Sequence, residues 1–369
     1  MKIGILTFHA SHNYGSMLQA YALQHFLHQK GYEVETINLR IIEQRRLYKF
    51  PLIPMKGLMR RYIKSMLNPL WLFHECKKWI RYEEFLEKYI KKSSKEYGSW
   101  EEIKKDLPIL GYQCIITGSD QIWNMKSHDF DISYFLPDRL LSIKKVAYSP
   151  SFGDLLSEIT NERERFIKGC VSEYSCISVR EKSMKDYLEK LLHREVELVL
   201  DPTLLLYSND YESIITKEPL IKGDYIFYYT PGVNFALEEF ALKISDHMGL
   251  TIVTSFPRIL RKKNFVSVYE AGPLEFLNLV KNAKFVIGKS FHLIAFSVLF
   301  HKEFIAIDGN SDSRMKSFLS LLSLSERGMV NENNYKTISL RNIDFDQVDR
   351  IIEEMRNHSR DFLIKSLNT

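Results

Sequence analysis

The chain has 369 residues, of which 51 are Lys or Arg and 46 are Asp or Glu, so its formal charge is +5. Its length predicts two domains, and its 45% hydrophobic and 26% charged residues are typical of a globular protein rather than a disordered one. The four cysteines form no C-x2-C pair, which argues against a zinc knuckle or a disulfide framework. Because neither a signal-peptide cleavage site nor an apolar run of roughly 18 residues is visible, we expect a cytoplasmic protein without a membrane span.

The first forty residues predict a strand, a loop, a helix and a second strand. Residues 3–8 are nearly all apolar, as in a strand covered on both faces, and residues 17–27 carry apolar side chains at helical spacing. Residues 34–38 predict the next strand and complete a βαβ unit. The loop 9–14 follows the carboxyl end of the first strand, where open α/β sheets bind ligands.

Residues 40–92 differ from the rest, with fourteen Lys or Arg and five Glu, a local charge of +9. Apolar residues recur among the basic ones at helical spacing, which predicts a basic helical insertion in the first domain over about 40–105. One interpretation is an insertion that packs on the domain and exposes a solvated basic face. The other is a surface for anionic lipid or an anionic acceptor, made of Arg45, Arg46, Lys49, Lys56, Arg60, Arg61 and Lys64 with Leu52, Ile53, Met59, Ile63 and Trp71.

Strands continue through the first half, and a second α/β series begins after Gly223. We predict strands over 114–116, 146–148, 176–179, 198–200, 225–229, 251–254, 285–287 and 304–307. Helices are expected near 234–248, 273–282, 291–300 and 345–367. This order predicts two Rossmann-like, doubly wound domains in a glycosyltransferase-B-like arrangement. The expected boundaries are 1–205, 223–340 and a C-terminal crossing helix in 341–369 that packs back on the first domain.

Two nucleotide-binding motifs are absent. The segment Gly288-Lys289-Ser290 ends like a P-loop, but Ala283 stands where that loop needs Gly, and the residues between are a predicted strand. The first strand is not followed by G-x-G-x-x-G. Residues 276–302 contain no Asp or Glu, although nucleotide-sugar enzymes of this architecture usually bind the donor ribose with a carboxylate there. These features favour an anionic donor that lacks a ribose.

The turn at 288–292 predicts a helix N-terminus at the carboxyl end of a strand. Ser290 is expected to cap this helix, and its first amides favour a phosphate or a carboxylate. His292 falls in the first turn, either as a buried structural histidine or as a functional group. Arg180 ends another predicted strand, where it either pairs with Glu181 or clamps a phosphate or carboxylate.

Five segments together resemble the polysaccharide pyruvyl transferase family. In chain order they are Asn13–Gln24, Gly118–Asn124, Ser178–Glu181, Asp201–Thr203 and Ser290–His292. The resemblance covers about residues 1–330 and implies a glycosyltransferase-B-like fold. It also implies transfer of pyruvate from phosphoenolpyruvate to a sugar as a cyclic ketal, with release of phosphate. Such sugars are often carried by a polyprenyl diphosphate at the inner face of the membrane, so the second interpretation of the basic insertion predicts peripheral, salt-sensitive membrane association.

The resemblance and the chemistry suggest roles for individual residues. His292 is implied as the catalytic acid, and Asp120 or Asn13 would position or deprotonate the acceptor hydroxyls. Characterised members often have Arg two places before the histidine, where this chain has Ser290, so Arg314 or Lys289 could supply the missing charge. The expected phosphoenolpyruvate contacts are Arg180, Lys289, Ser290, Phe291 and Arg314. The expected acceptor contacts are Asn13, Tyr14, Gly15, Gln19, Ser119 and Trp123.

This scheme requires no metal, and no metal-ligand spacing is seen. We therefore expect neither a metal nor a cofactor besides the donor substrate, and no nucleic-acid partner. Two other functions stay open at this point. One is a nucleotide-sugar-dependent glycosyltransferase of the same fold, and the other is a catalytically idle homologue that acts as a partner subunit.

Overall fold

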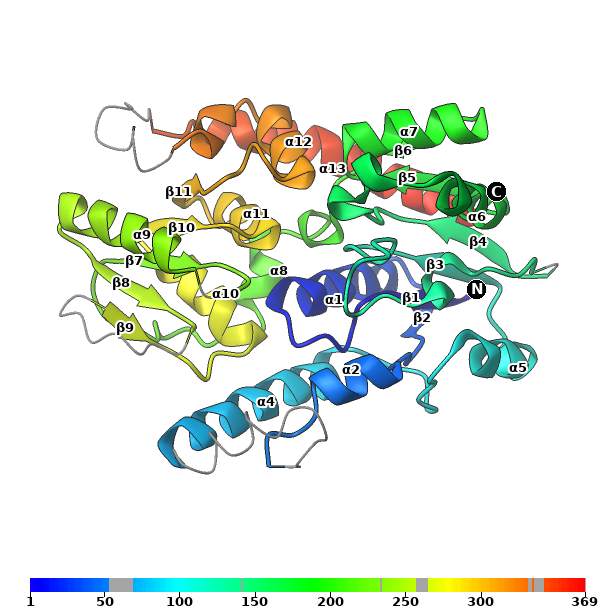
Figure 1. Cartoon of the computed structure of the whole chain (residues 1–369), viewed down its shortest axis with the longest axis horizontal. Coiled ribbons are helices and arrows are strands. Elements are labelled where there is room, and N and C mark those ends of the chain that lie inside the picture. Colours follow the sequence, from blue (N-terminus) through cyan, green and yellow to red (C-terminus); the bar gives the residue numbers. More distant parts are fainter. Residues whose placement is uncertain are drawn as a thin grey trace. The chain divides into compact units, whose positions relative to one another are not determined.

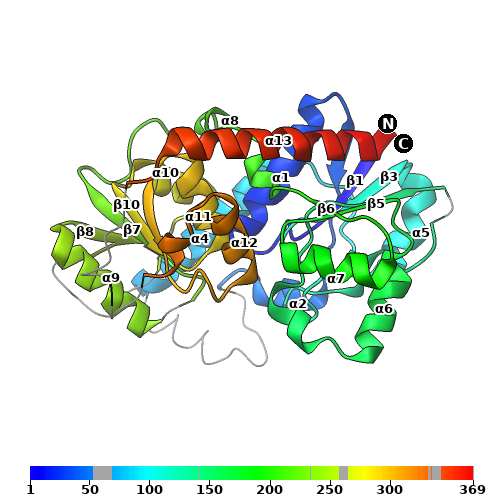
Figure 2. The same ribbon diagram turned by 90° about the horizontal axis from the view of Figure 1, so that it is seen from above.

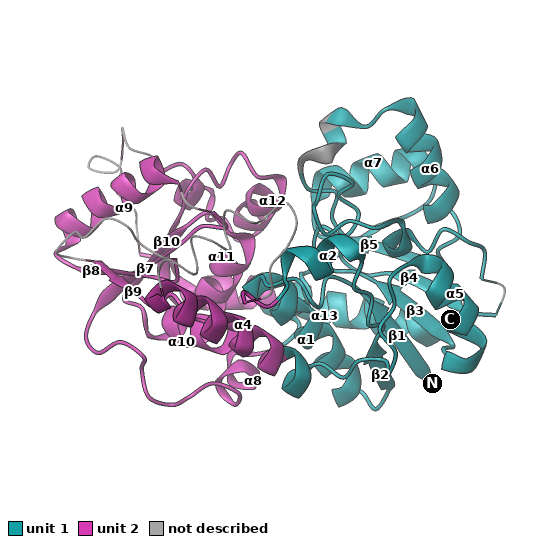
Figure 3. Ribbon diagram, turned by 60° about the horizontal axis from the view of Figure 1, so that its bottom comes forward, with its two compact units in different colours: residues 1–49, 86–206, 353–369 teal, residues 50–85, 207–352 magenta. Residues whose placement is uncertain are grey.

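The computed structural model describes residues 1–52, 69–140, 142–232, 234–256, 265–330, 334 and 342–368. The chain forms two compact units, shown in Figure 3. Unit 1 comprises residues 1–49, 86–206 and 353–369, and unit 2 comprises residues 50–85 and 207–352. Each unit contains one parallel sheet flanked by helices. The predicted pair of doubly wound α/β domains is therefore confirmed.

The sheet of unit 1 has six parallel strands in the order β2-β1-β3-β4-β5-β6 (Figure 1). The strands are β1 (Lys2–Leu6), β2 (Glu33–Thr36), β3 (Cys114–Thr117), β4 (Lys144–Ala147), β5 (Cys176–Val179) and β6 (Glu197–Leu198). The central strands β1 and β3 are short, mainly apolar runs that are buried almost completely, as expected for a parallel sheet with helices on its faces. All carboxyl ends lie at one edge, which brings the following loops together.

The helices of unit 1 begin directly after these loops. They are α1 (Tyr14–Gln29), α2 (Ile42–Leu47), α5 (Trp100–Leu110), α6 (Asn161–Val171) and α7 (Lys182–Leu192), with 3-10 turns η1 (Ile132–Phe135), η2 (Gly153–Glu158) and η3 (Pro202–Leu204). Helix α1 begins where the Asn13 side chain accepts hydrogen bonds from Gly15 N at 2.9 Å and Ser16 N at 3.3 Å. This cap fixes the direction in which α1 leaves the sheet edge.

The sheet of unit 2 has five parallel strands in the order β11-β10-β7-β8-β9. They are β7 (Tyr225–Tyr229), β8 (Thr251–Thr254), β9 (Phe265–Ser267), β10 (Phe285–Gly288) and β11 (Glu303–Ala306). The accompanying helices are α8 (Ser208–Glu212), α9 (Phe235–Met248), α10 (Pro273–Asn282), α11 (Phe291–Leu299) and α12 (Ser313–Leu321), followed by η4 (Ser325–Gly328). Gly288 ends β10, and a Cβ there would lie 2.0 Å from the Tyr229 carbonyl oxygen, so only Gly permits this close strand end.

Helix α4 (Pro69–Tyr89) corrects the expectation that the whole basic insertion belongs to the first domain. Its residues up to Phe85 belong to unit 2. In unit 2, Lys77 lies 3.3 Å from Glu270, and Arg81 lies 3.2 Å from Glu275. His74 contacts Glu270 at 3.2 Å. Part of the predicted docking surface lies outside the described residues, namely Ile53, Lys56, Met59, Arg60, Arg61, Ile63 and Lys64.

The last helix, α13 (Phe345–Asn368), is drawn in red in Figure 2, and from Glu353 onward it belongs to unit 1. The Leu200 amide donates to Ser359 Oγ at 2.9 Å, and Arg356 Nε donates to the Leu204 carbonyl at 2.8 Å. These bonds fix the segment that follows β6. Within the described ranges, no helix is long and apolar enough to cross a bilayer.

Candidate functional site

The loop after β3 is shaped by a close approach of two chain segments. A Cβ at Gly118 would lie 1.9 Å from the Tyr148 carbonyl oxygen at the end of β4, so this position requires Gly, whose φ is +131°. The chain then turns at Asp120, whose φ is +68°. This turn places the Asp120 carboxylate at the carboxyl edge of the unit 1 sheet.

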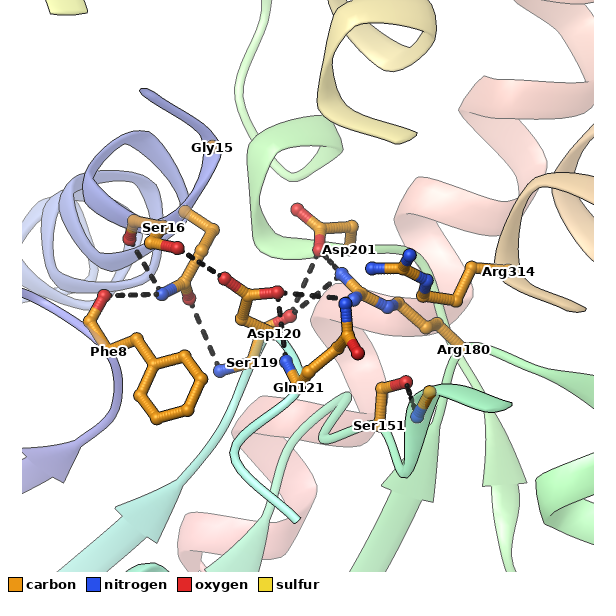
Figure 4. Close-up of polar contacts among 12 residues, drawn as sticks. Phe8, Gly15, Ser16, Ser119, Asp120, Gln121, Ser151, Arg180, Asp201 and Arg314 are labelled. Carbon is orange, nitrogen blue, oxygen red and sulfur yellow. Dashed lines mark hydrogen bonds and ion pairs between the residues drawn. The ribbon is translucent and has the colours of Figure 1, made fainter. Parts of the chain in front are cut away.

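Polar and charged side chains meet there in what we call the Asp120 cluster, made of Ser16, Asp120, Arg180, Glu181 and Asp201. Figure 4 labels all of these except Glu181. Ser16 Oγ at the start of α1 donates to Asp120 Oδ2 at 2.6 Å, and the Gln121 amide donates to Oδ1 at 2.8 Å. Arg180 donates through Nη1 to Asp201 Oδ2. Its Nη2 lies 3.7 Å from Asp120 Oδ1, and its Nε lies 3.5 Å from Glu181 Oε1.

The Asp120 cluster is buried and carries more negative than positive charge. The three carboxylates and the single guanidinium are each less than a tenth exposed. Buried charges need partners because leaving water is costly, and one guanidinium serves all three carboxylates here. The arrangement therefore suits a group that donates hydrogen bonds or gives up a proton, such as a hydroxyl, and disfavours an additional anion.

The predicted acceptor contacts in unit 1 need correction, because most of them are buried structural side chains. Gln19 Nε2 donates to Thr7 Oγ1 at 2.9 Å, and its Oε1 accepts from the Ser119 amide at 3.2 Å. Trp123 Nε1 donates to the Tyr134 carbonyl at 3.0 Å. These residues shape the loops that carry Asp120. The same applies to Tyr14 and Gly15, which are buried in α1, whereas Asn13 is half-buried and caps that helix.

Arg180 also departs from its predicted role as a phosphoenolpyruvate contact. Its side chain is only 2% exposed and is held by carboxylates. To bind the donor, the guanidinium would have to leave Asp201. Several buried carboxylates would then lack a positive partner. We therefore assign Arg180 to holding Asp120 and Asp201 in place, and the pairing with Glu181 that the sequence left open is part of this arrangement.

In unit 2, the predicted residues lie at the carboxyl ends of β10 and β11. His292 is buried in the first turn of α11, with its ring packed edge-on against Phe291 at 5.3 Å. Phe291 also packs on Phe318 at 5.5 Å, so its side chain belongs to the core rather than to a donor site. Ser290 occupies the N-cap position but makes no side-chain capping bond, which corrects the expected role of its hydroxyl.

The two basic side chains at this edge each pair with a nearby aspartate. Lys289 Nζ lies 2.8 Å from Asp308 Oδ2. Arg314 makes a two-point contact with Asp312, with Nε to Oδ1 at 3.1 Å and Nη2 to Oδ2 at 2.5 Å. Burial raises the pKa of Asp312, but the charge and hydrogen bonds of Arg314 and the capped backbone amides lower it overall. This carboxyl is therefore ionised at neutral pH.

Sequence reasoning assigned no role to three residues that complete these sites: Ser16, Asp201 and Asp312. Asp201 lies shortly after the end of β6, and the same signal, a carboxylate just beyond a strand end, had selected Asp120. Asp312 stands at the N-cap of α12, where a carboxylate before a helix is a local signal. The partnership of Ser16 with Asp120 spans 104 positions and has no local signal.

With this geometry described, the chain can be compared with known proteins. The model of the family described as polysaccharide pyruvyl transferase matches residues 13–311. The chain belongs to this family. The search of curated proteins gave no match.

Solved structures show what this member of the pyruvyl transferase family resembles in fold. The UDP-GlcNAc 2-epimerase of Neisseria meningitidis bound to UDP-GlcNAc superposes with a TM-score of 0.55 at 10% identity, covering 100% of this chain and 99% of that one. The UDP-GlcNAc 2-epimerase of Methanocaldococcus jannaschii gives a TM-score of 0.51 at 11% identity, covering 97% and 100%. At such low identities these similarities concern the fold alone. They confirm the predicted glycosyltransferase-B-like fold.

Proposed function

We propose that this pyruvyl transferase moves the pyruvyl group of phosphoenolpyruvate onto two hydroxyls of a sugar. The product is a cyclic ketal, and inorganic phosphate is released. The sugar belongs to a surface polysaccharide or to its lipid-linked precursor. The observation that carries the proposal is that three residues follow strands β10 and β11 of unit 2: Lys289, His292 in the first turn of α11, and Arg314 in α12.

The donor is expected at this edge of unit 2. Phosphoenolpyruvate carries a phosphate and a carboxylate, which favour cationic groups and helix amides. Lys289 and Arg314 offer the cations, and the backbone at Ser290 offers the amides. Asp308 and Asp312 hold the two cations before the donor arrives.

The acceptor is expected at the Asp120 cluster of unit 1. His292 delivers a proton to the C3 methylene of the donor, which makes C2 electrophilic. One sugar hydroxyl then bonds to C2 and loses its proton to Asp120, and the C2–O bond to phosphate breaks. The second hydroxyl bonds to C2 and closes the ring. Overall, one of the two hydroxyl protons ends on the new methyl group, and the other leaves on hydrogen phosphate.

The test is phosphate release from phosphoenolpyruvate in the presence of candidate acceptors. We would incubate the enzyme with the donor and a panel of p-nitrophenyl hexopyranosides and measure phosphate together with product mass. We expect phosphate release that depends on the acceptor and a product heavier than the glycoside by one pyruvyl ketal. Release of a nucleotide from a UDP- or GDP-sugar instead would contradict the proposal.

We further propose peripheral association with an anionic membrane, the expected location of a polyprenyl-linked acceptor. Helix α4 supports this, because Leu70, Phe73 and Ile80 are 68, 59 and 43% exposed on it. Basic residues that precede α4 would add electrostatic attraction of about 1 kcal/mol each near an anionic surface. Sedimentation with phosphatidylglycerol vesicles at about 50 mM salt tests this association. Wild-type protein that stays in the supernatant would contradict it. A Leu70→Ser/Phe73→Ser variant that sediments like the wild type would also contradict it.

A further inference from the structure

A second polar group of residues in unit 1 takes no part in the scheme above. We call it the Asp129 cluster, and it consists of Ser11, His12, Tyr48, Asp129 and Tyr134. Tyr48 Oη donates to Asp129 Oδ2 at 2.8 Å. The rings of His12 and Tyr48 stack with their centroids 5.0 Å apart and an interplanar angle of 24°. The cluster joins the loop after β1, the end of α2 and the segment after β3.

Three polar atoms of the Asp129 cluster are buried and lack a hydrogen bond of normal geometry among the described residues. They are Ser11 Oγ, Asp129 Oδ1 and Tyr134 Oη. Ser11 is 1% exposed and Tyr134 is fully buried. Buried polar atoms in folded proteins almost always have a well-formed hydrogen bond, and here three atoms whose contacts fall outside normal geometry lie in a single cluster. A polar group that both donates and accepts hydrogen bonds would satisfy all three.

The charges around the Asp129 cluster indicate which kind of ligand group could bind there. Burial raises the pKa of Asp129, and the charge of Asp120 adds to this, against the hydrogen bonds of Tyr48, Ser11 and Gln44. The carboxyl groups of Asp120 and Asp129 therefore interact electrostatically at the same edge of the sheet. A phosphate or carboxylate would be repelled there, whereas an uncharged hydroxyl can donate to Asp129 and accept from Ser11 or Tyr134.

The half-buried rim of the cluster points to the same class of ligand. His12 and Tyr48 are partly exposed, unlike the residues beneath them. Sites for uncharged ligands typically combine aromatic surface with a few fixed polar groups. Hydrogen bonds that are long in a ligand-free site often shorten only when the substrate is bound.

We propose that the Asp129 cluster is a subsite for the acceptor sugar. One sugar hydroxyl takes hydrogen bonds with Ser11, Asp129 and Tyr134, and the stacked rings of His12 and Tyr48 contact the face of the sugar. This rests on the proposed function, in which unit 1 receives the acceptor. It adds specificity-determining residues that all lie outside the five segments that carry the family resemblance.

The experiment is equilibrium binding of the p-nitrophenyl hexopyranoside panel without phosphoenolpyruvate, measured by isothermal titration calorimetry. The variants are Ser11→Ala and Tyr134→Phe, each of which removes a buried hydroxyl that makes no hydrogen bond of normal geometry among the described residues. We expect the Kd of the bound glycoside to rise about 5- to 10-fold in each variant. The Tm should change little, because neither hydroxyl makes a hydrogen bond of normal geometry among the described residues.

Tyr112→Phe is the matched control. The Tyr112 hydroxyl is also largely buried, but it donates to Glu35 Oε1 at 2.8 Å, near the amino end of the same sheet. This control should lower the Tm and leave the Kd unchanged. If Tyr134→Phe behaves like Tyr112→Phe, or if no glycoside binds the wild type, the subsite is wrong. Phosphate release is measured separately, so glycoside binding without turnover would overturn the proposed function and leave the subsite standing.

Discussion

The carboxyl edges of the two sheets differ in how their charges are paired. In unit 1, three carboxylates from different strand ends share the guanidinium of Arg180, and all are buried. In unit 2, Lys289 and Arg314 each have their own aspartate, and the Lys289 side chain is 43% exposed. The first edge is a fixed arrangement that holds excess negative charge. The second consists of separate ion pairs from which a stronger anion can take over the cations.

On the proposed function, this difference lets one architecture serve two substrates. The Lys289–Asp308 pair is half-exposed, and exposed ion pairs contribute little to stability, so exchanging Asp308 for a phosphate costs little. A buried cluster cannot be rearranged in this way, because each removed partner leaves an uncompensated charge. On this comparison, we expect variants in unit 2 to affect catalysis and donor binding, and variants in the Asp120 cluster to affect folding as well.

The largest effect is expected for His292→Ala in unit 2. If His292 is the acid, kcat for pyruvyl transfer should fall about 10²- to 10⁴-fold while the fold is retained. The control is His301→Ala, because His301 is half-exposed and pairs with Asp349. Steady-state kinetics with circular dichroism checks both variants. Near-wild-type turnover in His292→Ala would show that His292 is not the catalytic acid.

Arg180→Ala should distinguish a structural cluster from a donor site. Removing the guanidinium leaves buried carboxylates without their cation, so we expect a loss of about 3–5 kcal/mol in the free energy of unfolding. Arg139→Ala is the control, since Arg139 is 76% exposed and lies 3.7 Å from Glu173. Urea denaturation measures both. A variant of normal stability whose KM for phosphoenolpyruvate rises steeply would return Arg180 to the donor site.

Arg314→Ala tests whether the separate ion pairs of unit 2 hold the donor. Loss of a charge-assisted two-point contact should raise the KM for phosphoenolpyruvate about 10- to 100-fold and leave the KM for the acceptor unchanged. Lys284→Ala is the control, because Lys284 pairs with Asp224 just before β10, at the opposite end of that strand. Equal changes in both KM values would show that Arg314 supports the structure rather than the donor.

Much of this fold could be predicted because its strands are short apolar runs and its helices begin at recognisable caps. Strands β5, β7 and β8 and helix α10 have the predicted bounds. Strand β9 was not predicted because two of its three residues are exposed, so it lacks the apolar run that marks the others. Helix α4 was assigned to the wrong unit because its ion pairs with Glu270 and Glu275 join residues almost 200 positions apart.

The candidate site was predictable only in part, for a similar reason. Asp120 and His292 lie at strand ends, which sequence patterns can locate. Which side chains are buried there depends on tertiary packing, so Gln19 and Trp123 were mistaken for contact residues. The carboxylates around Arg180 come from three separate loops, and only the folded sheet edge brings them together.

The smallest predicted effect concerns His9, which follows β1 at the unit 1 edge. Burial lowers its pKa to about 4, Arg40 and Lys92 add to this, and the hydrogen bonds to Asn38 and Thr7 oppose it. In the unfolded chain the pKa is near 6.5, so His9 takes up a proton first in the unfolded state as the pH falls. The contribution of His9 to the free energy of unfolding is therefore fully present above about pH 6.5 and is lost progressively as the pH falls toward 4.

Between pH 7.5 and 5.5 this linkage should cost about 1 kcal/mol of unfolding free energy. Urea denaturation across that range tests it, with His9→Gln as the variant that cannot titrate. We expect a flatter pH profile for the variant, whatever its absolute stability. Parallel profiles would mean that His9 becomes protonated in the folded protein. The unit 1 edge would then carry a second cation, and the contrast with unit 2 would be weaker than the buried carboxylates indicate.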